Sequence, residues 1–170
     1  MDEHRLGLKP VLRRVWAPRG SHPVAPVRPR YRWLYVWAFV RPATGETFWL
    51  LLPTVSVAAC TLALREFARA VGAGPERRIA LAWDGAGWHT SRRVRMPEGL
   101  HPIRLPASSP ELQPAERLWP LVDEAVANRA VADLDELEDL LAERCRWLDA
   151  RPEVVKPLTA FHWWPDQGPA

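Results

Sequence analysis

Residues 31–52 read YRWLYVWAFVRPATGETFWLLL. The first ten letters are dense in aromatic and β-branched residues, which is typical of a buried strand over Tyr31 to Val40. Residues 42–45, Pro-Ala-Thr-Gly, predict a turn, and Thr47 to Leu52 predicts a returning second strand. Together these segments predict a β-hairpin, and the rest of the fold can be worked out from it in both directions.

The sequence on the C-terminal side of this hairpin alternates between helix and strand patterns. Ser56 is a predicted helix cap, apolar residues then follow on one face up to Val71, and Gly72 ends the helix. Further predicted elements, in chain order, are a covered strand over 78–83, a loop over 84–90, a short basic helix over 91–96, a strand over 101–105, a helix opened by Pro114 and a long helix capped by Asp133. The order β-β-α-β-α-β-α-α predicts an α/β fold, a mixed sheet with helices on both faces.

The composition is that of one globular domain. Of the 170 residues, 48% are hydrophobic and 25% are charged, which excludes an intrinsically disordered chain. No apolar run approaches the roughly 20 residues of a membrane span, and the first residues are not followed by the apolar region of a signal peptide. Cys60 and Cys145 lack the spacing of metal ligands, so we expect free buried thiols in a reducing, cytoplasmic compartment.

Charge is divided unevenly along the chain. Residues 1–104 carry 17 Lys and Arg against 7 Asp and Glu, whereas residues 105–170 carry 6 against 13. Nearly all the positive charges are arginines, whose planar fork of donors suits phosphate groups. The basic part therefore favours a polyanionic partner such as nucleic acid. A GC-rich genome and a solvated acidic helix would explain the same numbers, and charge alone does not separate the two interpretations.

Three acidic positions lie where a catalytic site could form. Asp84 directly follows a predicted buried strand, and open α/β sheets bind ligands outside the carboxyl ends of their strands. Asp2 forms a pair with Glu3 at the start of the chain, and Glu116 lies in the first turn of the helix opened by a proline. Each position also has a structural explanation, because a helix N-terminus favours a glutamate and chain termini are often poorly ordered.

Two sequence motifs resemble those of a known family. Residues 83–89 read WDGAGWH, and residues 105–119 read LPASSPELQPAERLW. Together with the pair Asp2-Glu3, they closely resemble bacterial insertion-sequence transposases related to the mariner superfamily, which are DDE-type enzymes with a ribonuclease H-like catalytic domain. Gln113 stands where asparagine is usual. The resemblance covers nearly the whole chain, and the second motif is its most specific element.

The resemblance implies the catalytic domain of a DNA transposase, with Asp2, Asp84 and Glu116 as catalytic residues and metal ligands. In-line attack on a phosphodiester needs charge neutralised on the entering and leaving oxygens, which two Mg²⁺ ions supply. Carboxylates are the hard oxygen ligands that Mg²⁺ prefers, and Mn²⁺ could substitute. The enzyme would nick a transposon end, and the released 3′-hydroxyl would attack target DNA. The implied partners are this double-stranded DNA, a second copy in an active homodimer, and an upstream helix-turn-helix polypeptide, with no membrane.

Seven further residues are candidate contacts to DNA. They are Arg13, Arg14, Arg19, His89, Arg92, Arg93 and Arg95. The first three lie in the stretch from Gly7 to Pro23, which is also similar to the family, and the others follow the second acid of the site, where arginines could hold the scissile backbone. A solvated basic helix face explains the last three arginines equally well. His89 could instead steady a metal-bound water or cap a helix at Thr90 and Ser91.

The resemblance predicts one catalytic domain at residues 1–164 and a tail at residues 165–170. The first catalytic aspartate lies at the start of the chain, so we expect a truncated first central strand, unpaired neighbours, and a marginally folded chain that is inactive alone. The alternative is an inactive transposase remnant that only binds DNA or a transposase partner. Pro120 should bend or restart the helix that carries Glu116, and the aromatic residues at 161–165 should dock on the domain.

Overall fold

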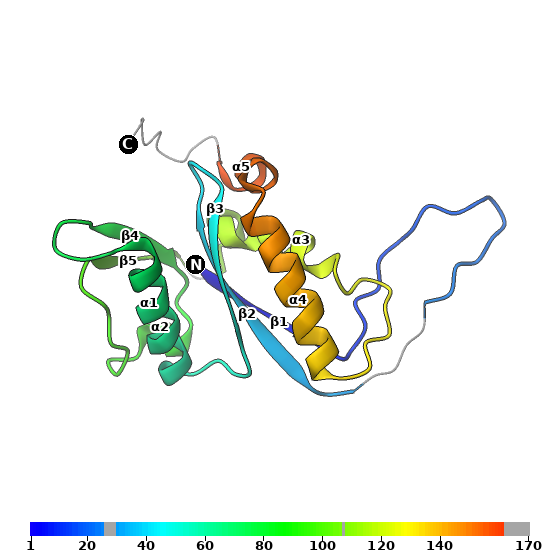
Figure 1. Cartoon of the computed structure of the whole chain (residues 1–170), viewed down its shortest axis with the longest axis horizontal. Coiled ribbons are helices and arrows are strands. Elements are labelled where there is room, and N and C mark those ends of the chain that lie inside the picture. Colours follow the sequence, from blue (N-terminus) through cyan, green and yellow to red (C-terminus); the bar gives the residue numbers. More distant parts are fainter. Residues whose placement is uncertain (26–29, 107, 162–170) are drawn as a thin grey trace.

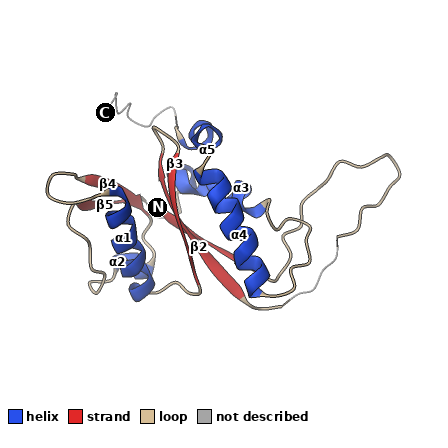
Figure 2. Cartoon of the chain, viewed as in Figure 1, coloured by secondary structure: helices blue, strands red, loops and turns tan. Residues whose placement is uncertain are grey.

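The computed structural model describes residues 1–25, 30–106 and 108–161, and its strands form two sheets (Figure 2). The strands are β1 (Asp2–Gly7), β2 (Trp33–Arg41), β3 (Glu46–Leu52), β4 (Ile79–Trp83) and β5 (Leu100–Arg104). An antiparallel sheet has the order β1-β2-β3, and β4 pairs in parallel with β5. The predicted hairpin is confirmed, because β2 and β3 pair from Tyr35 opposite Leu52 to Arg41 opposite Glu46.

The two long helices begin where the sequence predicts. α1 (Val57–Val71) is capped by Ser56, whose Oγ accepts a hydrogen bond from a first-turn amide at 3.1 Å, and it ends at Gly72 with φ 67°. α4 (Leu134–Asp149) is capped by Asp133, whose carboxylate accepts a first-turn amide at 2.9 Å. Both caps satisfy amide groups that a helix N-terminus leaves free.

The other helices are short, and one prediction about them is wrong. They are α2 (Gly87–Thr90), the 3₁₀ helices η1 (Pro110–Leu112) and η2 (Pro114–Leu118), α3 (Trp119–Asp123) and α5 (Pro152–Thr159). The basic helix expected over 91–96 is instead a turn and loop, and the helical turn comes earlier, where the amides of His89 and Thr90 both donate to Ala86 O. The cluster of arginines over residues 91–96 therefore does not indicate a helix. α5, which contains Pro157, was not predicted from the sequence.

Pro120 restarts the helix that follows Glu116, as expected. The 3₁₀ helix η2 ends at Leu118, and α3 begins at Trp119 with the proline in its first turn. A proline in a first turn lacks only an amide that would have no partner inside the helix. The docking expected for residues 161–165 lies, apart from Phe161, outside the described residues.

The prediction of a single mixed sheet is wrong, because the strands of the described residues form two sheets. β1 pairs with β2 from Asp2 opposite Ala38 onward, and toward β4 it contributes a hydrogen bond from Met1 N to Ala82 O at 2.6 Å. Beside this contact, residues of β2 and β4 line a groove of about 640 Å³, together with Met1. The two sheets are therefore joined by a hydrogen bond directly before β1 and by side-chain packing, not by a continuous strand ladder.

β2 is covered on both faces, which explains its nearly unbroken run of apolar residues. Side chains alternate along a strand. Val36 and Ala38 accordingly pack in a core with α3 and α4, whereas Trp37 and Phe39 pack in a second core with α1 and β4. Figure 1 shows α1 and α4 on opposite sides of this sheet. The expectation of an α/β fold with helices on both faces of a sheet is met around β2.

The described residues between β1 and β2 before position 26 extend away from the body of the molecule (Figure 1). Near the start of this segment, the Asn128 side chain accepts a hydrogen bond from Arg13 N at 2.9 Å and donates to Arg13 O at 3.0 Å. At the end of β1, a Cβ on Gly7 would lie 2.6 Å from Arg32 O and 2.7 Å from the ring of Trp33. No larger residue therefore fits at position 7.

The predicted cysteine chemistry is confirmed, since Cys60 and Cys145 are both free and buried. They lie in different cores, one with α1 and the other with α4. Across the described ranges, no helix has both the length and the apolar character needed to cross a membrane.

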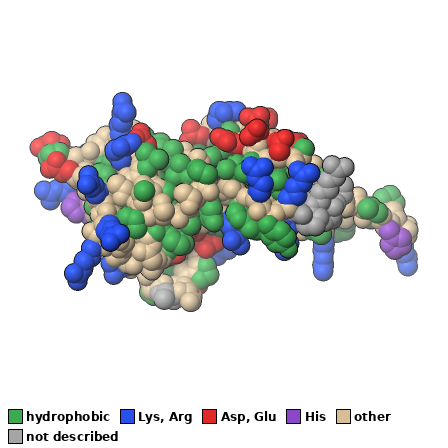
Figure 3. Space-filling view, turned by 90° about the horizontal axis from the view of Figure 1, so that it is seen from below, with side chains coloured by type: hydrophobic (Ala, Val, Ile, Leu, Met, Phe, Trp, Pro, Cys, Tyr) green, Lys and Arg blue, Asp and Glu red, His purple; other side chains and the backbone are tan. Residues whose placement is uncertain are grey.

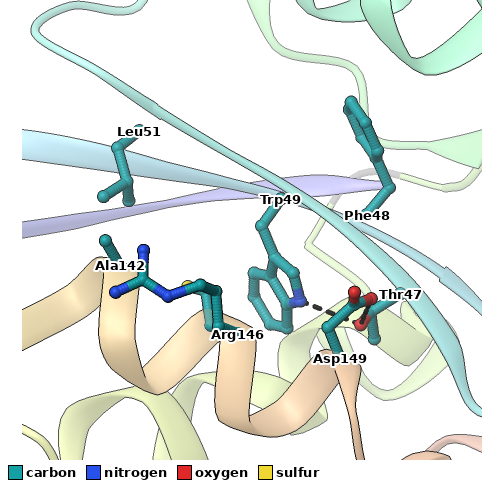
Figure 4. A pocket seen from close by; sticks show the side chains of 8 residues that line it. Thr47, Phe48, Trp49, Leu51, Ala142, Arg146 and Asp149 are labelled. Atoms are coloured by element: carbon teal, nitrogen blue, oxygen red, sulfur yellow. Dashed lines mark hydrogen bonds between the residues drawn. The ribbon is translucent and has the colours of Figure 1, made fainter. Parts of the chain in front are cut away.

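A cavity of about 290 Å³ lies between β3 and α4 (Figure 4). Within it, Trp49 Nε1 donates a hydrogen bond to Thr47 Oγ1 at 2.8 Å, and this hydroxyl donates to Asp149 Oδ1 at 3.0 Å. None of the three candidate acids lines this cavity, so it is separate from the site described next.

Candidate active site

The three candidate acids lie around the contact between β1 and β4. Asp2 opens β1, Asp84 directly follows β4, and Glu116 lies in η2. The hydrogen bond from Met1 N to Ala82 O joins the strand that opens with the first acid to the strand that leads to the second. Elements that are far apart in the sequence thus position the two aspartates on neighbouring strands.

Two hydrogen bonds hold the segment of Glu116 against β1. The side-chain amide of Gln113 donates to Met1 O at 2.8 Å, and the indole of Trp119 donates to Asp2 Oδ2 at 3.1 Å. Both donors come from the motif 105–119, on either side of Glu116. The motif therefore positions the third acid beside the first one.

Asp2 is the buried acid of the site, with 9% of its surface exposed. Its Oδ1 accepts a hydrogen bond from the amide of Glu3 at 2.8 Å, and its Oδ2 accepts the indole of Trp119. Burial raises the pKa of Asp2 to about 6, and the negative charge of Glu116 contributes to the rise. The two carboxylates are therefore close enough for their charges to interact.

Asp84 is the exposed acid, with 52% of its side chain accessible. Its Oδ1 accepts a hydrogen bond from Ala86 N at 2.9 Å and lies 2.6 Å from His89 Nδ1. Both contacts involve the same oxygen, so Oδ2 has no partner among the described residues. A Cβ on Gly85 or Gly87 would meet no atom within 4 Å, which leaves open space beside this carboxylate.

His89 connects Asp84 to β1 from inside the protein. Its Nε2 lies 2.7 Å from Glu3 Oε1, its side chain is 0% exposed, and its ring stacks on Trp83 with 4.8 Å between centroids. Burial by itself lowers the pKa of His89, but the hydrogen bonds and charges of Glu3 and Asp84 outweigh burial, so the pKa is raised. Neither ring nitrogen is free to meet a DNA phosphate in this arrangement.

Glu3 belongs to the site although the sequence analysis did not single it out as a site residue. Its side chain is 4% exposed, its Oε1 contacts His89, and its Oε2 accepts the indole of Trp88 at 3.3 Å. The available signal was strand alternation, because adjacent residues on a strand point to opposite faces. Asp2 accordingly faces Trp119, and Glu3 faces His89.

The arginines that the sequence offered as DNA contacts differ in their surroundings. Those with exposed side chains are Arg14, Arg19, Arg92, Arg93 and Arg95. Arg13 instead turns back onto α3, where its Nη2 donates to Pro120 O at 2.7 Å and lies 3.5 Å from Asp123 Oδ2. Figure 3 shows several basic side chains projecting from the surface of one face of the molecule.

The oxygen atoms of the site that have no hydrogen-bond partner are of the chemical type that binds a hard divalent cation. Asp84 has a carboxylate oxygen without a protein partner, and the buried Oε1 of Gln113, beside Met1, has no hydrogen-bond partner in the described structure. Oxygen donors of this type suit Mg²⁺ and Mn²⁺. Within residues 1–25, 30–106 and 108–161, no trio of His, Cys, Asp or Glu side chains already converges on one point.

Comparison with known sequences gives two matches. A family model described as DDE superfamily endonuclease matches residues 1–138. The uncharacterized protein y4pE/y4sA of Sinorhizobium fredii is 33% identical over 106 residues, which are 62% of this chain and 77% of that protein.

Comparison with solved structures finds the fold of Mos1. A chain of the Mos1 strand transfer complex has a TM-score of 0.59 and 20% identity, and the match covers 93% of this chain and 52% of that one. A chain of a pre-cleavage Mos1 transpososome has a TM-score of 0.60 and 17% identity, with 95% and 55% covered. The Mos1 mariner paired end complex with Mn has a TM-score of 0.57, 19% identity, and 95% and 55% covered. This chain thus spans about half the length of the Mos1 chains, and identities this low show a shared fold alone.

Proposed function

Because this chain belongs to the DDE superfamily endonucleases, we propose that it is the catalytic domain of a DNA transposase with a ribonuclease H-like fold. Asp2, Asp84 and Glu116 are its catalytic residues, and the reaction is phosphodiester cleavage followed by strand transfer. The observation that carries the proposal is the meeting of β1 and β4 at Met1 and Ala82. This contact sets two aspartates on neighbouring strands, while the charge of Glu116 acts on the first of them.

The three acids would hold divalent metal ions, Mg²⁺ or Mn²⁺. When bound, such ions would neutralise the charge that develops on the attacking and leaving oxygens of the phosphodiester. Asp84 offers Oδ2, which no donor among the described residues contacts. Asp2 is oriented by the amide of Glu3 and the indole of Trp119. Because burial disfavours the ionised form of Asp2, a nearby cation would favour the loss of its proton.

The DNA partner in this proposal is double-stranded DNA at the transposon ends and at the target. Arg92, Arg93 and Arg95 follow Asp84 and α2 along the chain and are exposed, so they can contact phosphates beside the scissile bond. Arg14 and Arg19 lie on the segment that extends from the body and would contact DNA farther away. A homodimer in the cytoplasm, assisted by an upstream helix-turn-helix polypeptide, would complete the active assembly.

A second candidate function is a module that binds DNA or a transposase without cleaving. The observation that favours it is the lack of three convergent ligands among the described side chains. The two candidates differ in metal binding, because a non-catalytic module needs DNA contacts but no cation at Asp84.

The test measures metal binding and DNA binding by the full 170-residue chain and two matched variants. Asp84→Asn removes the charge of the proposed ligand, and Asp139→Asn removes an exposed charge on α4. We expect Asp84→Asn to weaken Mn²⁺ binding at least about 10-fold, while DNA binding and the Asp139→Asn variant stay unchanged. DNA binding without Mn²⁺ binding in the wild-type chain would support the second candidate.

A further inference from the structure

The two acids of the pair Asp2-Glu3 lie on opposite faces of β1 and make different contacts. Asp2 faces Trp119 and the charge of Glu116. Glu3 faces the interior, where its Oε1 contacts His89 Nε2 at 2.7 Å and its Oε2 accepts the indole of Trp88 at 3.3 Å. With both oxygens in use and 4% of its side chain exposed, Glu3 is not placed to be a metal ligand itself.

His89 is held on every side that the structure describes. Its ring stacks on Trp83 at 4.8 Å with 13° between the planes, and the edge of Trp88 lies against it at 5.9 Å and 74°. Its Nε2 contacts Glu3 and its Nδ1 contacts Asp84. These contacts restrict the ring and hold Nδ1 against Asp84 Oδ1.

Asp84, by contrast, lies beyond the end of β4 with half of its side chain in solvent. Its orientation is set by the hydrogen bonds to Oδ1 from Ala86 N and His89 Nδ1. A ligand must be held within roughly half an ångström of its working position by the residues behind it. Of the two donors to Asp84, His89 is the one anchored to another strand.

We propose that Glu3 and His89 are positioning residues, which fix Asp84 Oδ1 so that Oδ2 is presented to a divalent cation. The proposal rests on the function proposed above for Asp84. The two adjacent acids on β1 have different roles in this proposal. Asp2 is itself a metal ligand, whereas Glu3 orients the metal ligand Asp84, which follows β4. Carboxylate–histidine contacts of this kind orient metal ligands in other proteins, and their loss typically weakens metal binding about 10- to 100-fold.

The proposal is tested by Mn²⁺ binding, followed by electron paramagnetic resonance of free Mn²⁺, in His89→Gln, Glu3→Gln and Asp84→Asn. Thermal melting is measured alongside. A glutamine at position 89 cannot span both carboxylates. Glu3→Gln keeps the size of the side chain and an oxygen that can accept a hydrogen bond. The matched control is His101→Gln, because His101 is an exposed histidine on β5.

We expect His89→Gln to weaken Mn²⁺ binding about 10-fold or more, Glu3→Gln to weaken it less, and His101→Gln to leave it unchanged. Lower melting temperatures with unchanged Mn²⁺ binding in both His89→Gln and Glu3→Gln would overturn the proposal, since the residues would then be merely structural. If His89→Gln fails to fold, Mn²⁺ binding by Glu3→Gln is the measurement that tests the proposal. Loss of binding in Asp84→Asn without loss in Glu3→Gln or a folded His89→Gln overturns only the positioning role. No loss in Asp84→Asn overturns the proposed function as well.

Discussion

The two aspartates of the site are held by different means. Asp2 is buried at the start of a paired strand, where the indole of Trp119 and the charge of Glu116 act on it. Asp84 is half exposed beyond the end of β4 and depends on a hydrogen bond to the buried His89. The comparison shows two ways of fixing a carboxylate. Burial fixes it but disfavours its ionised form, whereas a hydrogen bond to a buried residue fixes a half-exposed carboxylate without that penalty.

The Asp2 side of the site should depend most on core packing. Leu118 lies between Glu116 and Trp119 and is fully buried in the core with α3 and α4. We expect Leu118→Ala to lower the free energy of unfolding by about 4 kcal/mol, through lost burial and a residual cavity. Urea denaturation measures this, with Leu12→Ala at an exposed position as the control. A loss below about 1 kcal/mol would show that the segment of Glu116 is held independently of the core.

A second prediction concerns pH on the same side. The pKa of Asp2 is raised from 3.8 to about 6 in the folded state, so folding favours its protonated form. Its contribution to stability is then complete below pH 3.8 and is lost as pH rises through about 6. In metal-free protein we expect Asp2→Asn to gain stability relative to wild type between pH 4 and pH 7, by at most about 3 kcal/mol.

The measurement is urea denaturation in a chelator at pH 4, 5, 6 and 7. Trp119→Phe provides a second comparison in the same experiment, because the indole hydrogen bond lowers the pKa of Asp2. Loss of this hydrogen bond should steepen the decline in stability with pH. A difference between wild type and Asp2→Asn that stays constant with pH would contradict the idea that burial disfavours this charge.

The smallest effect is expected on the Asp84 side, at Trp88. Trp88→Phe removes the indole hydrogen bond to Glu3, which at 3.3 Å is longer than the contact of Glu3 with His89. We expect a loss of about 1 kcal/mol in the free energy of unfolding and none for Trp16→Phe, because Trp16 is fully exposed. A loss above about 2 kcal/mol would indicate that Glu3 is held mainly through Trp88.

Local signals in the sequence predicted the elements that local physics determines. The aromatic run over β2 and the caps at Ser56 and Asp133 act within a few residues, and the structure contains all three. The division into two sheets depends on how far β1 reaches along β4, a contact across 81 positions of the chain. No pattern within a short window carries that information.

The candidate site shows the same limit. Asp84 and Glu116 lie in motifs that can be recognised directly, so the sequence offered them together with Asp2. The support behind Asp84 was not recognised, because His89 meets Glu3 across 86 positions. A buried histidine with both nitrogens engaged looks, in the sequence, like any histidine that follows an aspartate.

The tight fit at Gly7 has a consequence for insertions and deletions. The chain between β1 and β2 is too long for a turn to set how these strands pair, but a Cβ at position 7 would overlap Arg32 O and the ring of Trp33. Shifting β1 by one residue would bring Leu6 or Leu8 to that place, and it would also exchange the faces of Asp2 and Glu3. Residues can therefore be gained or lost in the extended segment at little cost, whereas one residue gained or lost between Asp2 and Gly7 would turn the wrong acid toward Glu116.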